Sequence, residues 1–263
     1  MNIIYCSDKE YFKYLRISIL SLLEYNNNIV FYILTMDSPE TNQRSVSSTQ
    51  IAKLKTECAE TGKSFDIKVY NVRNLYEQLL FNSVNKNSIF TPFAGIRLLI
   101  PFICNIDKGL YIDCDFIILK SLEDIYNQNI ENDFLLAHLT DERLFFSGVY
   151  LYNIKKEREN DFLNIKKAIS FYINNSSPYP DQDALNFAYE KVNSLKLKKI
   201  FMYDKNAYMF HISSKHMPEI IDFLANSVFS KRGRKLHNKY HNIAQIISRL
   251  ENDTSENNIL FNN

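Results

Sequence analysis

The feature that most limits how this chain can fold is the alternation of apolar runs and helix-like segments in its first third. Three apolar runs have the length and composition of buried strands. The strand-like runs are 2–7, 29–36 and 65–72, and the helix-like segments between them are about 10–25 and 40–61. Strand, helix, strand, helix, strand at this spacing predicts a parallel sheet covered by helices.

The rest of the chain continues this α/β pattern. We expect further helices at 74–80, 94–102, 155–174 and 180–191, with others beginning at 218 and 235. We expect further strands at 109–113, 133–139, 145–154, 199–203 and 207–213. The fold class is therefore α/β, with a mixed, mostly parallel central sheet flanked by helices. We place one domain at 1–228 and a polar, locally basic helical tail at 229–263.

A pair of carboxylates interrupts the apolar stretch "KGLYIDCDFIIL" at residues 108–119. Asp113 and Asp115 are two positions apart, so on an extended strand both would point to the same side. Two like charges about 6 Å apart at an effective dielectric near 20 repel by roughly 3 kcal/mol. Asp8 follows the first strand, and no basic residue stands directly beside the pair. Three carboxylates at the carboxyl ends of strands predict a shared crevice that binds a divalent cation.

The glycine count points the same way. The chain has 5 glycines, and none are spaced as a phosphate-binding loop. A bound nucleotide would therefore need another group, such as a metal ion, to neutralise its phosphates. The net charge of +1 gives no general attraction to nucleic acid. No apolar window is long enough to span a membrane, no signal peptide is recognisable, and the 4 cysteines form no C-x-x-C pair. We expect a cytoplasmic protein with reduced thiols.

Six segments occur in an order that resembles the family 8 glycosyltransferases. They are "MNIIYCSDKEYFKYL", "RLLIPF", "KGLYIDCDFII", "FFSGVYLYNI", "PDQDALN" and "FHIS". The resemblance covers roughly residues 1–215 and implies a GT-A nucleotide-sugar-binding fold. It also implies a retaining, metal-dependent hexosyltransferase that uses a UDP-sugar, most often UDP-galactose or UDP-glucose. The implied acceptor is a surface glycan or a lipopolysaccharide-type glycolipid.

The resemblance assigns roles around the donor nucleotide. Asp8 resembles the uracil-binding aspartate and Tyr11 the aromatic residue near the base. Arg97 resembles the arginine that reaches towards the donor sugar and its phosphates. Cys114, between the two acids, belongs to the predicted nucleotide-sugar site, and Lys215 is the candidate for a phosphate-binding lysine.

The same resemblance predicts a metal site. Asp113 and Asp115 match the metal-binding pair, and His211 matches a third ligand that arrives from the C-terminal part of the domain. A histidine nitrogen added to carboxylate oxygens favours Mn²⁺, with Mg²⁺ as the alternative. The metal would stabilise the negative charge of the departing diphosphate.

Four residues match the sugar pocket. Ser147 and Gly148 correspond to small residues that line it, and Asp181 and Gln182 correspond to positions near the anomeric carbon. Gln182 is a poor nucleophile, so we favour front-face displacement, in which the departing phosphate takes the acceptor's proton. Asp181 follows Pro180 and could also start a helix.

Two departures from the family pattern support other readings. Phe146 stands where relatives usually carry Asn, and "HISSKHMPE" replaces the usual glycine and Lys-Pro-Trp after the histidine. A catalytically silent sugar-nucleotide or glycan-binding module on the same fold is the main alternative. A phosphatase of the haloacid dehalogenase type is disfavoured, because Ile117 breaks its motif and the acid pair does not follow the first strand.

The basic run "KRGRKLHNKYH" at 231–241 differs from the rest of the chain. A solvated helix face is one explanation. The other is peripheral contact with the inner face of an anionic membrane that carries the acceptor.

Overall fold

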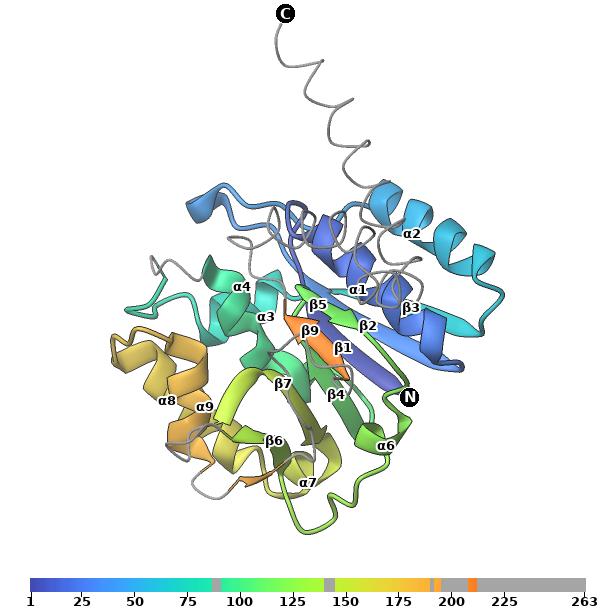
Figure 1. Ribbon diagram of the computed structural model, residues 1–263. Helices are drawn as coiled ribbons and strands as arrows, with labels where there is room; N and C mark the ends of the chain where they lie inside the picture. The colour runs from blue at the N-terminus through green and yellow to red at the C-terminus, as the bar shows by residue number, and fades with distance from the viewer. Residues whose placement is uncertain (87–90, 140–144, 190–191, 195–207, 212–263) are drawn as a thin grey trace, which may run out of the picture.

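The computed structural model describes residues 1–86, 91–139, 145–189, 192–194 and 208–211. Helices cover both faces of a central sheet (Figure 1). Within the described ranges this sheet has 7 strands in the order β3-β2-β1-β4-β7-β6-β8. Four neighbouring pairs are parallel, and β7 runs antiparallel to both β4 and β6. The predicted mixed, mostly parallel α/β sheet is confirmed.

The three strands predicted in the first third of the chain are present as β1, β2 and β3. The parallel strands are β1 (Asn2–Cys6), β2 (Ile29–Thr35), β3 (Phe65–Asn71) and β4 (Lys108–Ile112). β7 (Phe145–Asn153) lies antiparallel between β4 and β6 (Leu135–Leu139). The last strand at this side of the sheet is β8 (Asn193–Ser194), which pairs parallel with β6. A separate two-stranded ribbon pairs β5 (Phe116–Ile118) with β9 (Met209–His211).

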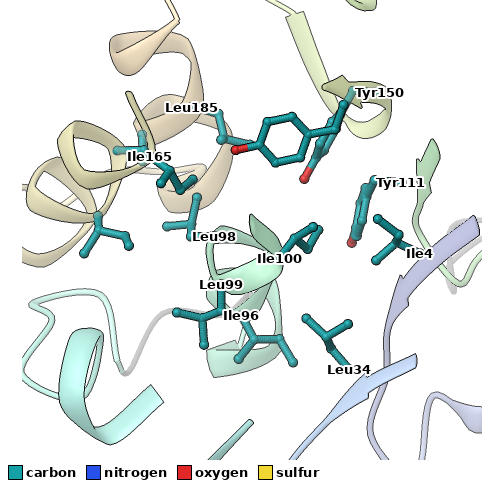
Figure 2. Packing of buried hydrophobic residues seen from close by; sticks show 14 of the residues in the cluster. Ile4, Leu34, Ile96, Leu98, Leu99, Ile100, Tyr111, Tyr150, Ile165 and Leu185 are labelled. Atoms are coloured by element: carbon teal, nitrogen blue, oxygen red, sulfur yellow. The ribbon is translucent and has the colours of Figure 1, made fainter. Parts of the chain in front are cut away.

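The core lies on both sides of the sheet. Ile3 and Tyr5 pack under α1 (Phe12–Tyr25) and α2 (Ser48–Glu60), whereas Ile4 faces the opposite layer. Successive strand residues point to opposite faces, so a strand covered on both sides is apolar throughout. Figure 2 shows the second layer, in which Ile4 and Tyr111 of the sheet pack near Ile100.

Two predicted helices are interrupted. The expected helix at 40–61 is a short 3₁₀ turn, η1 (Pro39–Thr41), followed by a loop and then α2. Ser47 and Gln50 form a capping box that starts α2, and Gly62 follows its end at φ +67°. The loop instead pairs with the end of β1 through a bridge between Asp8 and Ser45.

The expected helix at 155–174 is also divided. It consists of α7 (Ile154–Glu159) and α8 (Leu163–Asn174). Asp161 and Phe162 between them have φ values of 51° and 59°. This left-handed conformation is incompatible with a continuous right-handed helix.

Short helices complete the described part. The segment predicted as one helix at 94–102 comprises α4 (Thr91–Gly95), η2 (Ile96–Leu99) and α5 (Ile100–Ile103). Pro101, which has no N–H to donate, lies at the start of α5. The others are α3 (Arg73–Leu79), α6 (Glu123–Tyr126) and α9 (Pro180–Ala188).

Several predictions lie outside the described residues. They are the strand at 199–203, the helices from 218 and 235, the domain boundary at 228, the tail at 229–263 with its basic run 231–241, and Lys215. The predicted strand 207–213 is described only in part, as β9. Among the described residues, no helix is both long enough and apolar enough to cross a membrane.

Candidate active site

The two acids of the "DCD" motif lie in a turn and not on a strand. β4 ends at Ile112 and β5 begins at Phe116, so Asp113 and Asp115 belong to the connection between them. The expectation that both point to the same side of one strand is wrong, because the strand ends before the first acid. Asp113 donates its backbone N–H to the Gly148 carbonyl at 2.8 Å, which ties the turn to β7.

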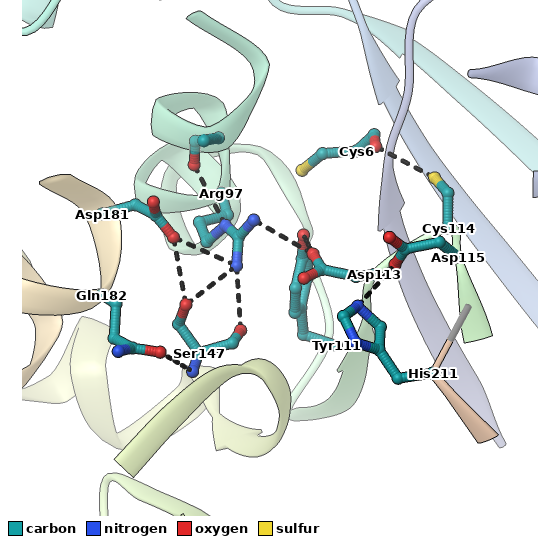
Figure 3. A network of polar contacts seen from close by, with 11 residues as sticks. Cys6, Arg97, Tyr111, Asp113, Cys114, Asp115, Ser147, Asp181, Gln182 and His211 are labelled. Atoms are coloured by element: carbon teal, nitrogen blue, oxygen red, sulfur yellow. Dashed lines mark hydrogen bonds and ion pairs between the residues drawn. The ribbon is translucent and has the colours of Figure 1, made fainter. Parts of the chain in front are cut away.

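Arg97 connects the first acid to α9 (Figure 3). Its Nη2 lies 3.0 Å from Asp113 Oδ1, and its Nη1 lies 3.2 Å from Asp181 Oδ2. The same Nη1 donates to the Ser147 carbonyl at 2.9 Å, and Ser147 Oγ donates to Asp181 Oδ2 at 3.1 Å. We call Arg97, Asp113, Ser147 and Asp181 the arginine cluster. The sequence has no basic residue next to the acid pair, and we expected none beside it in the fold. That expectation is wrong, because Arg97 contacts Asp113.

Buried groups support the arginine cluster. Arg97 is only 7% exposed, and its guanidinium lies 4.8 Å from the centre of the Tyr111 ring. The Tyr111 hydroxyl donates to Asp113 Oδ1 at 2.6 Å. Arg97 Nε also donates to the Ala94 carbonyl at 3.0 Å. The guanidinium is thus held in place by several contacts, and its predicted contact with a donor sugar stays a prediction.

The second acid has a different partner. Asp115 Oδ1 lies 3.3 Å from His211 Nε2, because the β5–β9 pairing sets Phe116 opposite His211. The His211 ring also packs 4.7 Å from the Phe116 ring and 5.8 Å, edge-on, from the Phe146 ring. Phe146, which stands where relatives usually have Asn, therefore forms an apolar wall beside the histidine.

Gly148 permits close packing in the first half of β7. A Cβ placed there would lie 2.8 Å from Asp113 Oδ2 and would also collide with the Phe146 ring. Ser147 N–H donates to Gln182 Oε1 at 3.1 Å, which places the predicted catalytic amide beside the same strand. The structure thus brings Ser147, Gly148 and Gln182 close together, and their roles at a sugar stay predictions.

Asp8 and Tyr11, the predicted base-binding residues, follow β1, which is the neighbour of β4 in the sheet. Asp8 is 3% exposed and accepts the Tyr11 backbone N–H at 2.6 Å. It also accepts from Gln43 Nε2 at 2.8 Å. The Tyr11 side chain is 43% exposed and packs against Tyr14. Burial and then the charge of Asp115 raise the pKa of the Tyr11 hydroxyl to about 12, which indicates that Tyr11 lies near the acid pair.

Cys114 does not present its side chain to the site. Its Sγ donates to the Cys6 carbonyl at 3.1 Å and is buried between the strands (Figure 3). Burial raises the pKa of the Cys114 thiol well above its ordinary value. The thiol is therefore a packing group, and a nucleotide contact through its backbone stays a prediction. Cys6, Cys58, Cys104 and Cys114 form no disulfide in the structure.

Three groups of the site have shifted pKa values: Asp113, His211 and Arg97. Burial raises the pKa of Asp113 to about 6, although Arg97 acts in the opposite direction. Burial lowers the pKa of His211, but the hydrogen bond and charge of Asp115 outweigh it, so the net shift is upward. Burial also opposes the charge of Arg97, yet Asp113 and Asp181 raise the pKa of its guanidinium well above the ordinary value. The arginine is thus fixed as a cation.

The donor chemistry of the predicted metal ligands fits a divalent ion only in part. Carboxylate oxygen and imidazole nitrogen suit Mn²⁺, and Asp115 and His211 are already neighbours. Asp113 Oδ1, however, faces Arg97 and Tyr111, and its Oδ2 lies next to Gly148. Within the described residues no three His, Cys, Asp or Glu side chains come together as a metal-holding group. The three-ligand site stays a prediction.

Sequence reasoning missed three residues that build this site. Tyr111 is two positions before Asp113, a spacing that could have marked it as a partner. Asn186 ties α9 to β7 by bonding both backbone groups of Phe145 at 2.9 and 3.0 Å, and it follows Gln182 by one helical turn. Gln43 has no local signal, since it lies in a loop predicted as helix.

Comparison with known proteins adds to this geometry. The family model described as Glycosyl transferase family 8 matches residues 2–259. The chain belongs to glycosyl transferase family 8. A Haemophilus influenzae protein named as a glycosyltransferase is 29% identical to this family 8 chain over 208 residues. The match covers 71% of this chain and 58% of the relative. Glycosyltransferase GlyD of Streptococcus pneumoniae is 30% identical over 60% of this chain and 18% of its own length. The matched region thus spans less than two thirds of these relatives.

Solved structures agree on the fold of the family 8 chain. The galactosyltransferase LgtC, in complex with donor and acceptor sugar analogues, superposes with a TM-score of 0.54 at 21% identity, covering 74% of this chain and 73% of LgtC. GlyE of Streptococcus pneumoniae gives a TM-score of 0.62 at 18% identity, covering 96% and 63%. The predicted GT-A fold is confirmed.

Proposed function

We propose that this family 8 chain is a metal-dependent, retaining hexosyltransferase. It moves galactose or glucose from a UDP-sugar to a surface-glycan or lipopolysaccharide-type acceptor. The observation that carries the proposal is the arginine cluster, because one buried cation joins the "DCD" turn to Asp181 at the start of α9. LgtC, which shares the fold, was solved with donor and acceptor sugar analogues, and this supports donor and acceptor sugars as the ligands here.

The residues divide the work of the reaction between them. Asp8 would accept a hydrogen bond from the base, and Asp115 and His211, with Asp113, would hold Mn²⁺ or Mg²⁺. The bound metal would stabilise negative charge on the diphosphate. Asp181 and the Gln182 amide, fixed by Ser147, would face the sugar as its anomeric carbon gains positive character.

In the proposed transfer, the acceptor attacks the sugar from the same face that the diphosphate leaves. The bond from the anomeric carbon to the diphosphate oxygen breaks, and its electron pair leaves with the diphosphate. The acceptor hydroxyl oxygen forms the new bond on the same face, and its proton passes to a departing phosphate oxygen. Gln182 donates no electron pair in this step, because an uncharged amide is a poor nucleophile; its Oε1 accepts the Ser147 N–H.

A silent binding module is the second candidate, and Phe146 is the observation that favours it. Its ring packs against His211 where relatives usually offer a polar side chain. Hydrolysis of UDP-sugars in the presence of Mn²⁺ separates the two functions. Turnover supports the enzyme, whereas binding of UDP without turnover supports the module.

The metal assignment is tested by Asp115→Ala. Calorimetric titration with UDP, with and without Mn²⁺, should show that the metal strengthens binding to the unaltered protein about tenfold or more. The variant should lose this metal dependence and keep its thermal unfolding temperature. Asp124→Ala, at an exposed acid of α6, is the matched control and should behave like the unaltered protein. Unchanged manganese dependence in Asp115→Ala would show that the metal assignment is wrong.

A further inference from the structure

The loop between β2 and α2 is built against the predicted base-binding acid. Asn42 adopts φ 57°, and the loop closes on itself through a bridge between Ser38 and Gln43. A second bridge joins Asp8 to Ser45, and Lys9 N–H donates to the Arg44 carbonyl at 2.8 Å. The loop therefore has a defined shape beside the end of β1. We call residues 37–45 the Gln43 loop.

The far side of the Gln43 loop has its own anchor. Arg73 of α3 contacts both carboxylate oxygens of Glu40, at 2.6 and 2.9 Å. It also donates to the Asp37 carbonyl at 3.3 Å. These contacts do not involve Gln43, so a change of the Gln43 side chain should leave the loop backbone in place.

The Gln43 amide is oriented by its two partners. Its Nε2 donates to Asp8 Oδ2 at 2.8 Å, and its Oε1 accepts from the Thr41 hydroxyl at 2.8 Å. An ionised carboxylate can only accept, so the reverse orientation would place two acceptors together. Asp8 therefore fixes which end of the amide faces it.

Asp8 is a buried acid held by neutral donors. It is 3% exposed, and the donors that the structure describes are the Tyr11 backbone N–H and the Gln43 amide. Neither neutralises its charge. Each carboxylate oxygen has a second lone pair, so Asp8 can accept one more hydrogen bond from a ligand.

We propose that Gln43 is a base-selecting positioning residue, an inference that rests on the proposed function. By donating to Oδ2, Gln43 keeps Asp8 an acceptor and fixes the direction of its free lone pairs. Uracil carries an N–H at ring position 3, which such an acceptor binds. Cytosine has an unprotonated nitrogen there, which the same carboxylate repels. Gln43 thus acts through Asp8 to favour a uridine nucleotide over a cytidine nucleotide.

The test compares UDP with CDP on the full chain. Both nucleotides carry the same diphosphate, so metal and phosphate contacts cancel in the ratio of the two dissociation constants. Gln43→Leu should weaken UDP binding about tenfold, the scale of a lost hydrogen bond to a charged group, and leave CDP binding nearly unchanged. Gln78→Leu, at an exposed glutamine of α3, is the matched control and should keep the ratio.

A second variant makes the inference sharper. Gln43→Glu sets two carboxylates side by side, and such a pair shares a proton. A protonated Asp8 could donate to the cytosine nitrogen, so the preference for UDP should fall at least as far as in Gln43→Leu. If Gln43 had a purely structural role, both variants would weaken the binding of UDP and CDP equally. The ratio of the two dissociation constants would then stay the same.

The outcomes separate this inference from the proposed function. If the unaltered protein prefers UDP and both Gln43 variants keep that preference, the inference is wrong and the proposed function stands. If the unaltered protein binds neither nucleotide in the presence of Mn²⁺, the proposed function and the inference both fail. A ratio that falls in both variants, but not in Gln78→Leu, supports Gln43 as the base-selecting residue.

Discussion

The two ends of the candidate site hold their acids in opposite ways. In the arginine cluster, one buried cation lies between Asp113 and Asp181. At the other end, Asp8 is buried and accepts from a backbone N–H and the Gln43 amide. The first end has an arginine of the protein between its acids, whereas among the described residues the printed donors to Asp8 are both uncharged.

This difference matches the proposed tasks of the two ends. Acids that must stay in fixed positions around a reacting centre benefit from a cation that also fixes their geometry, since catalytic groups lose effect when they are displaced. An acid that recognises a neutral base needs only orientation, because a cationic partner would compete with the base for its lone pairs. Burying an acid whose described partners are all uncharged costs stability.

The largest expected effect comes from removing the cation. Arg97→Leu leaves Asp113 and Asp181 facing each other without their partner, and breaking a buried ion pair in this way costs about 3–5 kcal/mol. Thermal or urea unfolding should show this loss. UDP-sugar hydrolysis should fall by about 10²-fold or more, because both acids lose their positions.

A matched arginine serves as the control. Arg16 contacts Glu57 with Nε and Nη2, at 2.5 and 2.6 Å, and lies between α1 and α2. Arg16→Leu should lower stability by a smaller amount and leave the rate of hydrolysis of the folded protein unchanged. An Arg97→Leu protein that unfolds like the unaltered chain would contradict the view that the cation holds this end together.

The sequence predicts the scaffold better than it predicts the arginine cluster. The parallel arrangement of β1, β2 and β3 follows from apolar runs and their spacing, which are local properties. The contact of Arg97 with Ser147 joins residues 50 positions apart in the chain. No pattern of period 2 or 3.6 carries such information, so Arg97 could be assigned to a site by resemblance but not to its two acids.

The missed loop has a physical explanation of the same kind. The sequence predicts one polar helix over residues 40–61. The capping box at Ser47 and Gln50 was readable in the sequence and marks the true start of α2. The position of Gln43 beside Asp8, in contrast, depends on a bridge to another strand end and could not be read locally.

A smaller effect is expected where the arginine cluster meets the turn that carries Asp113 and Asp115. Gly148→Ala places a methyl group 2.8 Å from Asp113 Oδ2 and against the Phe146 ring. Both neighbours are ends of side chains, so we expect them to shift at a cost of about 1–3 kcal/mol in stability, the usual range for overpacking. Activity should fall about tenfold, because Asp113 is displaced.

The double variant Gly148→Ala with Phe146→Leu identifies which neighbour matters. If the Phe146 ring pushes the alanine onto Asp113, the second change should restore part of the activity, measured as a coupling in a double-mutant cycle. If activity stays low while stability recovers, displacement of Asp113 alone explains the loss. Full activity in the single variant would show that the close approach at Gly148 has no catalytic role.

The smallest expected effect concerns Glu157. Like Asp8, it accepts hydrogen bonds from uncharged donors, but it has no predicted role in the candidate site. It is fully buried, and it accepts the Ile165 N–H at 2.9 Å and the Tyr189 hydroxyl at 3.0 Å. Burial raises the pKa of Glu157 above its ordinary value of 4.5. The folded state therefore binds this proton more readily than the unfolded state does, and the resulting stabilisation is lost as the pH rises through the folded-state pKa.

Glu157→Gln measures what such a neutral environment costs an ionised acid. The amide keeps an acceptor for the Ile165 N–H and does not titrate. Position 157 should therefore add nothing to the pH dependence of the variant's stability. The unfolding free energy of the unaltered protein, relative to the variant, should fall as the pH rises from 4.5 upward, by at most about 1.4 kcal/mol per pH unit. Urea unfolding of both proteins across that range provides the measurement.

If the difference in unfolding free energy stays constant, Glu157 is not destabilised when ionised. Neutral donors would then be sufficient to hold a buried acid, and the contrast between Asp8 and the arginine cluster would concern geometry more than charge.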